Sequence, residues 1–298
     1  TGGDRNFDYY SCSSTTDESG PEVVYQIDLP EDGFVALSLD GLPSGVDVDV
    51  HLLNTLDAND CIDRGHWDAG ALMLAGTYYV VVDSWVSSSG TEMDGDYTVS
   101  IGHTTPSLMG SYGIDSTMAS YALLAFDEAW FGADTARFEY TLIDFSMSAI
   151  ERRFWVLDLR TGDELYNEYV THGVNSSDPS DVNMAVEFSN VNGSLKSSLG
   201  VMVTAEDYTG TYGHSMRYDG LEPGFNDNVR SRYIVLHSGD YATQDYVDTW
   251  GELGESWGCT VIDPVIVDDV IDLIMDGTLA FAYYPDTTYL TNSTYLNP

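Results

Sequence analysis

Apolar and polar side chains alternate with a period of two through most of the first hundred residues. The runs EVVYQIDL, FVALSLD and VDVDVHLL, and later GTYYVVVDSW and GDYTVSIG, each place apolar residues on one face. Turn-forming clusters such as PEDG, DGLPSG and MDGD separate these runs. Short alternating strands bounded by turns predict an antiparallel β-sandwich over residues 1–104.

Two carboxylates share one face of the third run with His51. Strand geometry separates Asp47 and Asp49 by about 7 Å, and their oxygen atoms are ligands that suit Ca²⁺. We interpret the pair as an ordinary polar outer face, with a Ca²⁺ site as the alternative. His51, His66 and His103 lack metal-ligand spacing, so we expect them at the surface or in local hydrogen bonds.

The charge balance narrows the range of partners. The 298 residues carry 49 acidic and 10 basic side chains, a net charge of −39. Such a field repels phosphate backbones and anionic lipids, which argues against nucleic-acid binding and favours the solvated coat of a secreted protein. No apolar run approaches the roughly 20 residues of a membrane span. Nothing at Thr1 resembles a signal peptide, so we expect a trimmed or mature chain.

The three cysteines divide unevenly along the chain. Cys12 and Cys61 lie in the first region and Cys259 stands alone, which predicts one disulfide and one free thiol. Two buried thiols in the first region are the alternative. A Cys12–Cys61 bridge implies an oxidising, extracytoplasmic compartment.

Residues 105–298 mix helices with a majority of strands. Residues 101–116 are small, polar and turn-rich, which indicates a linker. A helix capped by Ser116 follows, and RTGD predicts a hairpin turn. Asp263 is suited to cap a second helix, whose predicted buried stripe is Ile266, Val270, Leu273 and Ile274. SRYIVLHSG and TLAFAYYP are typical of strands.

Two family resemblances follow from the motifs. The strand Asp-Val-Asp-Val-His-Leu-Leu, a Cys-bearing loop, GTYYVVV and GDYTV resemble bacterial pre-peptidase C-terminal domains over residues 8–102. That resemblance implies a small jelly-roll-like β-sandwich that acts as an accessory or binding module. SSLG (197–200), GHSMRYDGLEPGFNDN (213–228), RYIVLHSGDY (232–241) and SWGC (256–259) resemble murein L,D-transpeptidase catalytic domains, called YkuD-like, over residues 118–286.

The second resemblance implies roles for individual residues. Cys259 matches the nucleophile, His237 matches the base that activates it, and Ser238 matches a position that orients the imidazole. Ser256, Trp257 and Gly258 form the approach to the nucleophile, where backbone N–H groups would make an oxyanion hole. The family needs no metal or organic cofactor and rebuilds peptidoglycan cross-links outside the cytoplasm.

The residues alone support the same chemistry, because a thiol needs a neighbouring base to become a good nucleophile. The N-terminus of the helix expected after Asp263 would also favour the thiolate of Cys259. Three positions depart from the family. Trp257 replaces the His of better-known members and is usual in the SWGC branch, whereas Glu255 and Thr260 stand where that branch more often has Arg and Pro. Glu255 places negative charge beside a thiol that must ionise.

Further candidates lie outside the motif cysteine and histidine. Tyr212 and His214 belong to a segment that resembles a substrate-facing loop. Arg217, Arg230 and Arg232 are suited to bind stem-peptide carboxylates. The alternative is that these arginines balance the neighbouring acids Asp219, Glu222 and Asp227. We expect His172 to be structural.

The sequence therefore predicts an exported two-domain enzyme, with an accessory sandwich over residues 1–104 and a catalytic domain over residues 105–298. By resemblance, Cys259 attacks the third residue of a stem peptide and the thioester passes to an amine. Two alternatives stay open: an L,D-carboxypeptidase or endopeptidase that hydrolyses stems, and a catalytically silent wall-binding protein. The stem identities, the ligand of the first domain and the oligomeric state are not predicted.

Overall fold

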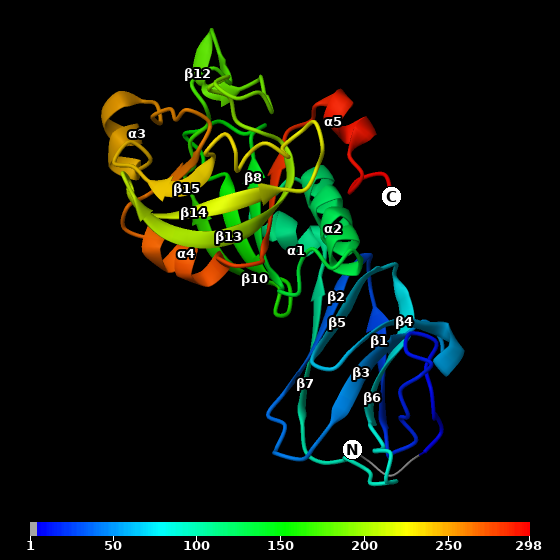
Figure 1. The fold of residues 1–298 in the computed structure, drawn as a ribbon. Helices are drawn as coiled ribbons and strands as arrows, with labels where there is room; N and C mark the ends of the chain where they lie inside the picture. Colours follow the sequence, from blue (N-terminus) through cyan, green and yellow to red (C-terminus); the bar gives the residue numbers. More distant parts are fainter. Residues whose placement is uncertain (1–4) are drawn as a thin grey trace. The chain divides into compact units, whose positions relative to one another are not determined.

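The computed structural model describes residues 5–298 and is mainly β (Figure 1). The chain divides into two compact units. The first contains residues up to Ala119 together with Leu159–Gly162, and the second contains Ser120–Asp158 together with Asp163–Pro298. The mainly β fold confirms the predicted class, and the proposed boundary at residues 104/105 stays a prediction.

The first unit is a sandwich of two antiparallel sheets, as the alternation predicts. One sheet has the order β1-β6-β3-β4 and the other β5-β2-β7. The apolar faces of the strands meet in a core that includes Val35, Leu37, Val50 and Val82. Elements of this unit are β1 (Val23–Leu29), β2 (Gly33–Asp40), β3 (Val48–Leu53), the 3-10 helix η1 (Ala58–Asp60), β4 (Cys61–Gly65), β5 (Asp68–Met73), β6 (Gly76–Ser84), β7 (Thr98–Thr104) and α1 (Pro106–Ser111).

The polar face of β3 is covered, so its interpretation as an ordinary outer face is wrong. Asp49 is 2% exposed and His51 is 0% exposed. The Tyr10 ring stacks on His51 with 3.7 Å between ring centroids, and a Glu18 carboxylate oxygen lies 2.9 Å from His51 Nε2. The segment that carries Tyr10 and Glu18 thus covers this face. The predicted disulfide Cys12–Cys61 is confirmed and fastens that segment to β4.

The expected linker at residues 101–116 is mostly regular structure, so that prediction is wrong. Residues 101–104 extend β7 because they continue its antiparallel pairing with β2. Residues 106–111 form α1, where the Thr105 hydroxyl caps the helix by accepting from the Leu108 N–H at 3.1 Å.

The second unit is built on an eight-stranded sheet of order β10-β9-β8-β17-β13-β14-β15-β16. Most neighbours are antiparallel, but β8/β17 and β15/β16 are parallel. The RTGD hairpin is confirmed as the β9–β10 turn. Elements of this unit are β8 (Glu139–Asp144), β9 (Phe154–Asp158), β10 (Asp163–Glu168), β11 (Ser177–Asp178), β12 (Asp181–Ala185), β13 (Gly200–Gly210), β14 (Gly213–Gly220), β15 (Val235–Ser238), α3 (Gln244–Trp250), β16 (Thr260–Ile262), α4 (Val267–Ile274), β17 (Leu279–Tyr283) and α5 (Thr287–Asn292); α2 (Ser116–Phe131) runs into this unit from the first.

Both predicted helices exist, but their starts differ from the prediction. At α2 the carboxylate of Asp115, rather than Ser116, accepts from the Thr117 and Met118 N–H groups. At α4 the helix begins at Val267. Residues 260–262 are drawn into the sheet as β16, and Asp263 instead accepts from the Val265 N–H in a turn. The buried stripe of α4 is therefore Val267, Val270, Ile271 and Ile274.

Candidate active site

The parallel pairing of β15 with β16 brings the candidate base and nucleophile to one edge of the sheet. His237 is the register partner of Val261, and Cys259 directly precedes β16. With strands about 4.8 Å apart and about 3.3 Å per residue, the two Cα atoms are separated by roughly 8 Å. Both side chains line one cavity of about 440 Å³. Its lining residues are Tyr212, Arg232, Tyr233, Ile234, His237, Tyr241, Glu255, Ser256, Trp257 and Cys259.

His237 is held as a neutral base. Its Nδ1 lies 2.8 Å from the Ser238 carbonyl oxygen. Because a carbonyl only accepts, Nδ1 carries the proton and Nε2 is left as an acceptor. The Tyr212 ring stacks on the imidazole with 4.4 Å between ring centroids. Burial lowers the pKa of His237, and the bond to Ser238 partly offsets this. Ser238 thus orients the imidazole through its backbone.

Cys259 is a free, half-buried thiol. Its Sγ donates weakly to the Tyr233 carbonyl oxygen at 3.5 Å. Burial raises the pKa of the thiol, while the Val235 N–H and the Arg232 charge act in the opposite direction. A neutral thiol beside a neutral imidazole is therefore the resting pair. The expected support from a helix N-terminus is wrong, because α4 begins eight residues after Cys259.

The SWGC motif forms a turn that one hydroxyl closes. Ser256 Oγ donates to the Cys259 carbonyl at 2.8 Å and accepts from the Gly258 N–H at 3.1 Å. Gly258 has φ 111°, and a Cβ at this position would lie 2.6 Å from the Lys196 carbonyl oxygen. Only glycine fits there without strain. Trp257 is 74% exposed at the rim of the cavity.

Arg232 belongs to the cavity wall, but its hydrogen bonds point into the protein. It is 8% exposed, and its two Nη atoms make four hydrogen bonds within the loop that contains SSLG. The acceptors are Ser189 O, Ser198 Oγ, Ser194 Oγ and Lys196 O. These bonds use all four Nη hydrogens, so the guanidinium acts on Cys259 through its charge rather than as a fork for a substrate carboxylate.

The other predicted substrate residues do not line this cavity. Arg217 and Arg230 both pair with Glu206, at 3.1 and 2.8 Å, and Arg230 also pairs with Asp219. His214 lies between Asp207 and Asp268, at 3.0 and 3.2 Å. Of the residues predicted to bind substrate, Tyr212 and Arg232 line the cavity.

The motif at residues 213–228 supplies framework contacts. Glu222 is buried, and its carboxylate accepts from the Val201 N–H and the Tyr289 hydroxyl. The Asn226 amide donates to the carbonyls of Leu199 and Val201. These bonds tie SSLG to the segment after β14 and so support the cavity wall that Arg232 completes.

Sequence reasoning missed Tyr233, Tyr241 and the inward role of Glu255. Tyr233 has φ 58°, an uncommon backbone state for a residue with a side chain. This conformation aims its carbonyl at the thiol of Cys259. Its position inside the RYIVLHSGDY motif was the only available signal.

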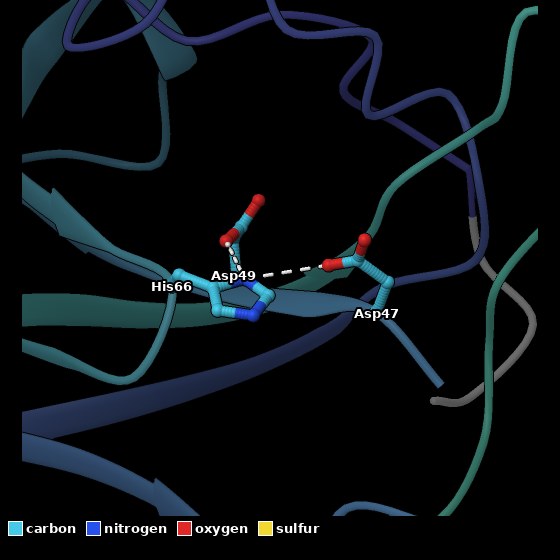
Figure 2. A group of neighbouring side chains, drawn as sticks. All are labelled: Asp47, Asp49 and His66. Carbon is cyan, nitrogen blue, oxygen red and sulfur yellow. Dashed lines mark hydrogen bonds and ion pairs between the residues drawn. The ribbon is translucent and has the colours of Figure 1, made fainter. Parts of the chain in front are cut away.

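One group of side chains in the first unit has the composition of a cation site. His66 Nδ1 lies 3.3 Å from an Asp47 carboxylate oxygen and 3.1 Å from an Asp49 carboxylate oxygen (Figure 2). All three ligand atoms lie within 4.8 Å of one another. Asp49 is also paired with Arg64, whose guanidinium pairs with Glu18 as well. His66 is exposed and hydrogen-bonded to Asp49, as the sequence predicts, and the turn after β4 brings it beside two aspartates that are distant in sequence.

Among residues 5–298, no helix is both long and apolar enough to cross a membrane.

Three solved structures of L,D-transpeptidases resemble this chain. A cysteine-to-serine mutant from Enterococcus faecium is 15% identical with a TM-score of 0.29, covering 49% of this chain and 49% of that chain. This chain thus spans about half the length of that relative. The LD transpeptidase LdtMt1 in complex with imipenem is 11% identical (TM-score 0.31), covering 88% of this chain and 97% of that one. The enzyme from Mycobacterium smegmatis is 12% identical (TM-score 0.31), covering 89% and 100%.

No curated protein matches the chain. The family profile of the L,D-transpeptidase catalytic domain matches residues 110–283. This match spans more than half of the sequence, and it includes the strand that carries His237 and the turn that carries Cys259. The chain therefore belongs to the L,D-transpeptidase catalytic domain family, a family of enzymes.

Proposed function

We propose that this protein is a cysteine-dependent peptidoglycan L,D-transpeptidase that works through a thioester acyl-enzyme. One observation carries the proposal: the Cys259 thiol and the His237 imidazole line the same cavity, at the ends of adjacent parallel strands, in a chain of this family. The free acceptor nitrogen of His237 suits it to take the thiol proton.

In the first half-reaction, Cys259 Sγ attacks the carbonyl carbon of the third residue of a donor stem peptide. The thiol proton passes to His237 Nε2, the peptide C–N bond breaks, and the terminal D-amino acid leaves with that proton. The Gly258 N–H is already bonded to Ser256 Oγ. We therefore assign the developing oxyanion to the N–H groups of Trp257 and Cys259.

In the second half-reaction, an amine of a neighbouring stem attacks the thioester. His237 takes a proton from the amine and returns one to the departing sulfur. If water takes the place of the amine, the same site acts as an L,D-carboxypeptidase or endopeptidase. A wall-binding protein without catalysis is the remaining alternative, and it would have no use for a reactive thiol.

The first unit, by this proposal, is an accessory module of the pre-peptidase C-terminal type, attached near residues 104/105 to a catalytic domain of the SWGC branch. The Cys12–Cys61 disulfide supports placement outside the cytoplasm, because such bonds persist in oxidising compartments. Peptidoglycan stems are the partners that this location and this family imply.

The test is incubation with purified tetrapeptide muropeptides, with products identified by mass. We expect cross-linked dimers, and an acyl adduct on Cys259 with either a tetrapeptide donor or a carbapenem. Cys259→Ser should remove both adduct and product while the fold is retained, because the change is nearly isosteric. Hydrolysed stems without dimers would establish the hydrolytic alternative, and no adduct at all would leave the binding protein.

A further inference from the structure

Glu255 places a carboxylate in the wall of the catalytic cavity, beside the SWGC turn. It is half-buried, and within residues 5–298 no arginine, lysine or histidine forms an ion pair with it. Of its two carboxylate oxygens, Oε1 accepts from the Ser177 hydroxyl. Within residues 5–298, no hydrogen bond is formed to Oε2. A carboxylate in the cavity wall that is held through one oxygen, and whose other oxygen is open, can accept hydrogen bonds from a cationic ligand.

A directed chain of hydrogen bonds holds this carboxylate in place. Arg153, 0% exposed, donates from Nη2 to His172 Nδ1 at 2.7 Å. Since arginine cannot accept, the proton of His172 is on Nε2, which donates to Ser177 Oγ at 3.0 Å. The Ser177 hydroxyl proton is then directed at Glu255. Every bond runs one way, from the buried guanidinium to the carboxylate in the cavity.

The protonation state of this hydrogen-bonded chain also does not change with pH. Burial and the neighbouring Arg153 charge lower the pKa of His172 to about 3, so the imidazole stays neutral over the working pH range. A backbone hydrogen bond joins the same two segments, since the Ser256 N–H donates to the His172 carbonyl at 2.9 Å. Ser177 thus holds the Glu255 carboxylate, and His172 holds the backbone beside it, in the wall of the cavity.

We propose that Glu255 forms an ammonium-binding subsite that selects an amine-bearing acyl acceptor over water. This inference rests on the proposed function, because only an acyl-transfer enzyme needs to prefer an amine. A carboxylate that already accepts one hydrogen bond can accept further charge-assisted bonds from an ammonium. Arg232, on the same cavity, adds no competing donor, because its Nη hydrogens are used inside the protein.

The reaction balances with the acceptor bound in this way. The ammonium held at Glu255 first releases one proton to water and becomes a neutral amine. Its nitrogen then forms the new C–N bond while the C–S bond of the thioester breaks. The second proton passes from nitrogen to His237 and from there to the sulfur of Cys259, which restores the thiol. Glu255 binds and concentrates the acceptor and takes no part in bond making.

The experiment compares Glu255→Gln with Glu252→Gln, a matched loss of charge three residues away and outside the cavity. Wild type and both variants are acylated with a tetrapeptide donor and then offered glycinamide, which is cationic near neutral pH, or hydroxylamine, which is uncharged. Loss of a charge-assisted bond is worth about 1.5–3 kcal/mol. We therefore expect the KM for glycinamide to rise roughly tenfold to a hundredfold in Glu255→Gln, with kcat little changed.

The other readouts of Glu255→Gln should move differently. Acylation by the donor and the KM for hydroxylamine should stay near wild type, and the share of thioester lost to water should rise. Equal KM changes for both nucleophiles, or an equal effect in Glu252→Gln, would overturn the proposal. Glycinamide binding to the unacylated protein, followed by NMR, separates two failures. If no acyl-enzyme forms, the proposed function fails. In that case the subsite is still supported if glycinamide binding is lost in Glu255→Gln, and it is refuted if glycinamide binding is unchanged.

Ser177 tests the chain as a positioning element. Ser177→Ala removes the hydroxyl that orients Glu255 and should raise the KM for glycinamide less than Glu255→Gln does, with kcat unchanged. Ser177→Thr keeps the hydroxyl and should restore the wild-type KM. A fall in kcat with an unchanged KM in Ser177→Ala would point to a general structural defect and contradict the positioning role.

Discussion

The ionisation state of Cys259 gives the sharpest test of the site. Burial raises the pKa of this thiol above its ordinary value of 9.0, and the Val235 N–H and Arg232 offset this only in part. The thiol is therefore mostly protonated at pH 7. The reactivity of Cys259 toward a small alkylating reagent should therefore climb about tenfold per pH unit from about pH 6 to about pH 9.

Iodoacetamide kinetics measure this directly, because the other two cysteines are joined in a disulfide. Cys259→Ser supplies the baseline. A rate that is flat below pH 7 would show a thiolate–imidazolium ion pair and would refute the neutral resting pair derived from the burial of Cys259 and His237.

Acylation by a donor substrate should respond differently from alkylation. Because the pKa of His237 is lowered, its imidazole stays neutral to a pH below the ordinary histidine pKa of about 6.5. Acylation should therefore fall only when the pH drops below that lowered pKa. His237→Ala removes the proton acceptor and should slow acylation on the order of 10² to 10⁴-fold. An acylation rate that His237→Ala leaves unchanged would eliminate the dyad.

Two further predictions concern strain and stability. Gly258→Ala forces a side chain into φ 111° and toward the Lys196 carbonyl. We expect the free energy of unfolding to fall by at least about 1–2 kcal/mol, which lowers the melting temperature, and the acylation rate to fall more than about tenfold. Wild-type behaviour in both assays would contradict the strain. Burial raises the pKa of Asp83 to about 8. Between about pH 4 and pH 8 the folded state therefore holds a proton that the unfolded state has lost. The free energy of unfolding should decline as the pH rises through that window, by at most about 1.4 kcal/mol per pH unit. Asp83→Asn should flatten this decline in denaturant titrations while Asp94→Asn, at an exposed carboxylate, should not; equal slopes in the two variants would dismiss Asp83 as the source.

The sandwich strands that were predicted could be found because apolar and polar residues alternate along them, which gives the sequence a period of two. β4 and β5 were missed because Cys61–Gly65 and Asp68–Met73 are short and rich in small or charged residues. The cover over His51 was also missed. It depends on contacts from Tyr10 and Glu18, in a segment with no periodicity, and a pattern along the chain does not reveal contacts across it.

The site was partly predictable for a related reason. His237 and Cys259 belong to motifs at the ends of strands, so their order along the chain indicated the chemistry. The surroundings of Glu255 depend on Arg153, His172 and Ser177, which come from three other parts of the chain. Nothing in their spacing indicates that they form one hydrogen-bonded chain.

The one-way polarity of that chain has a consequence for how the sequence can vary. A Glu255→Arg change would place a donor where the Ser177 hydroxyl needs an acceptor, and would put positive charge at both ends of the same four-residue chain. The Ser177 proton would lose its partner, and the neutral His172 would lie between two guanidinium groups. Substitutions at these four positions should therefore be inherited as a set. Relatives that carry arginine at the position of Glu255 should differ as well at the positions of His172 or Ser177.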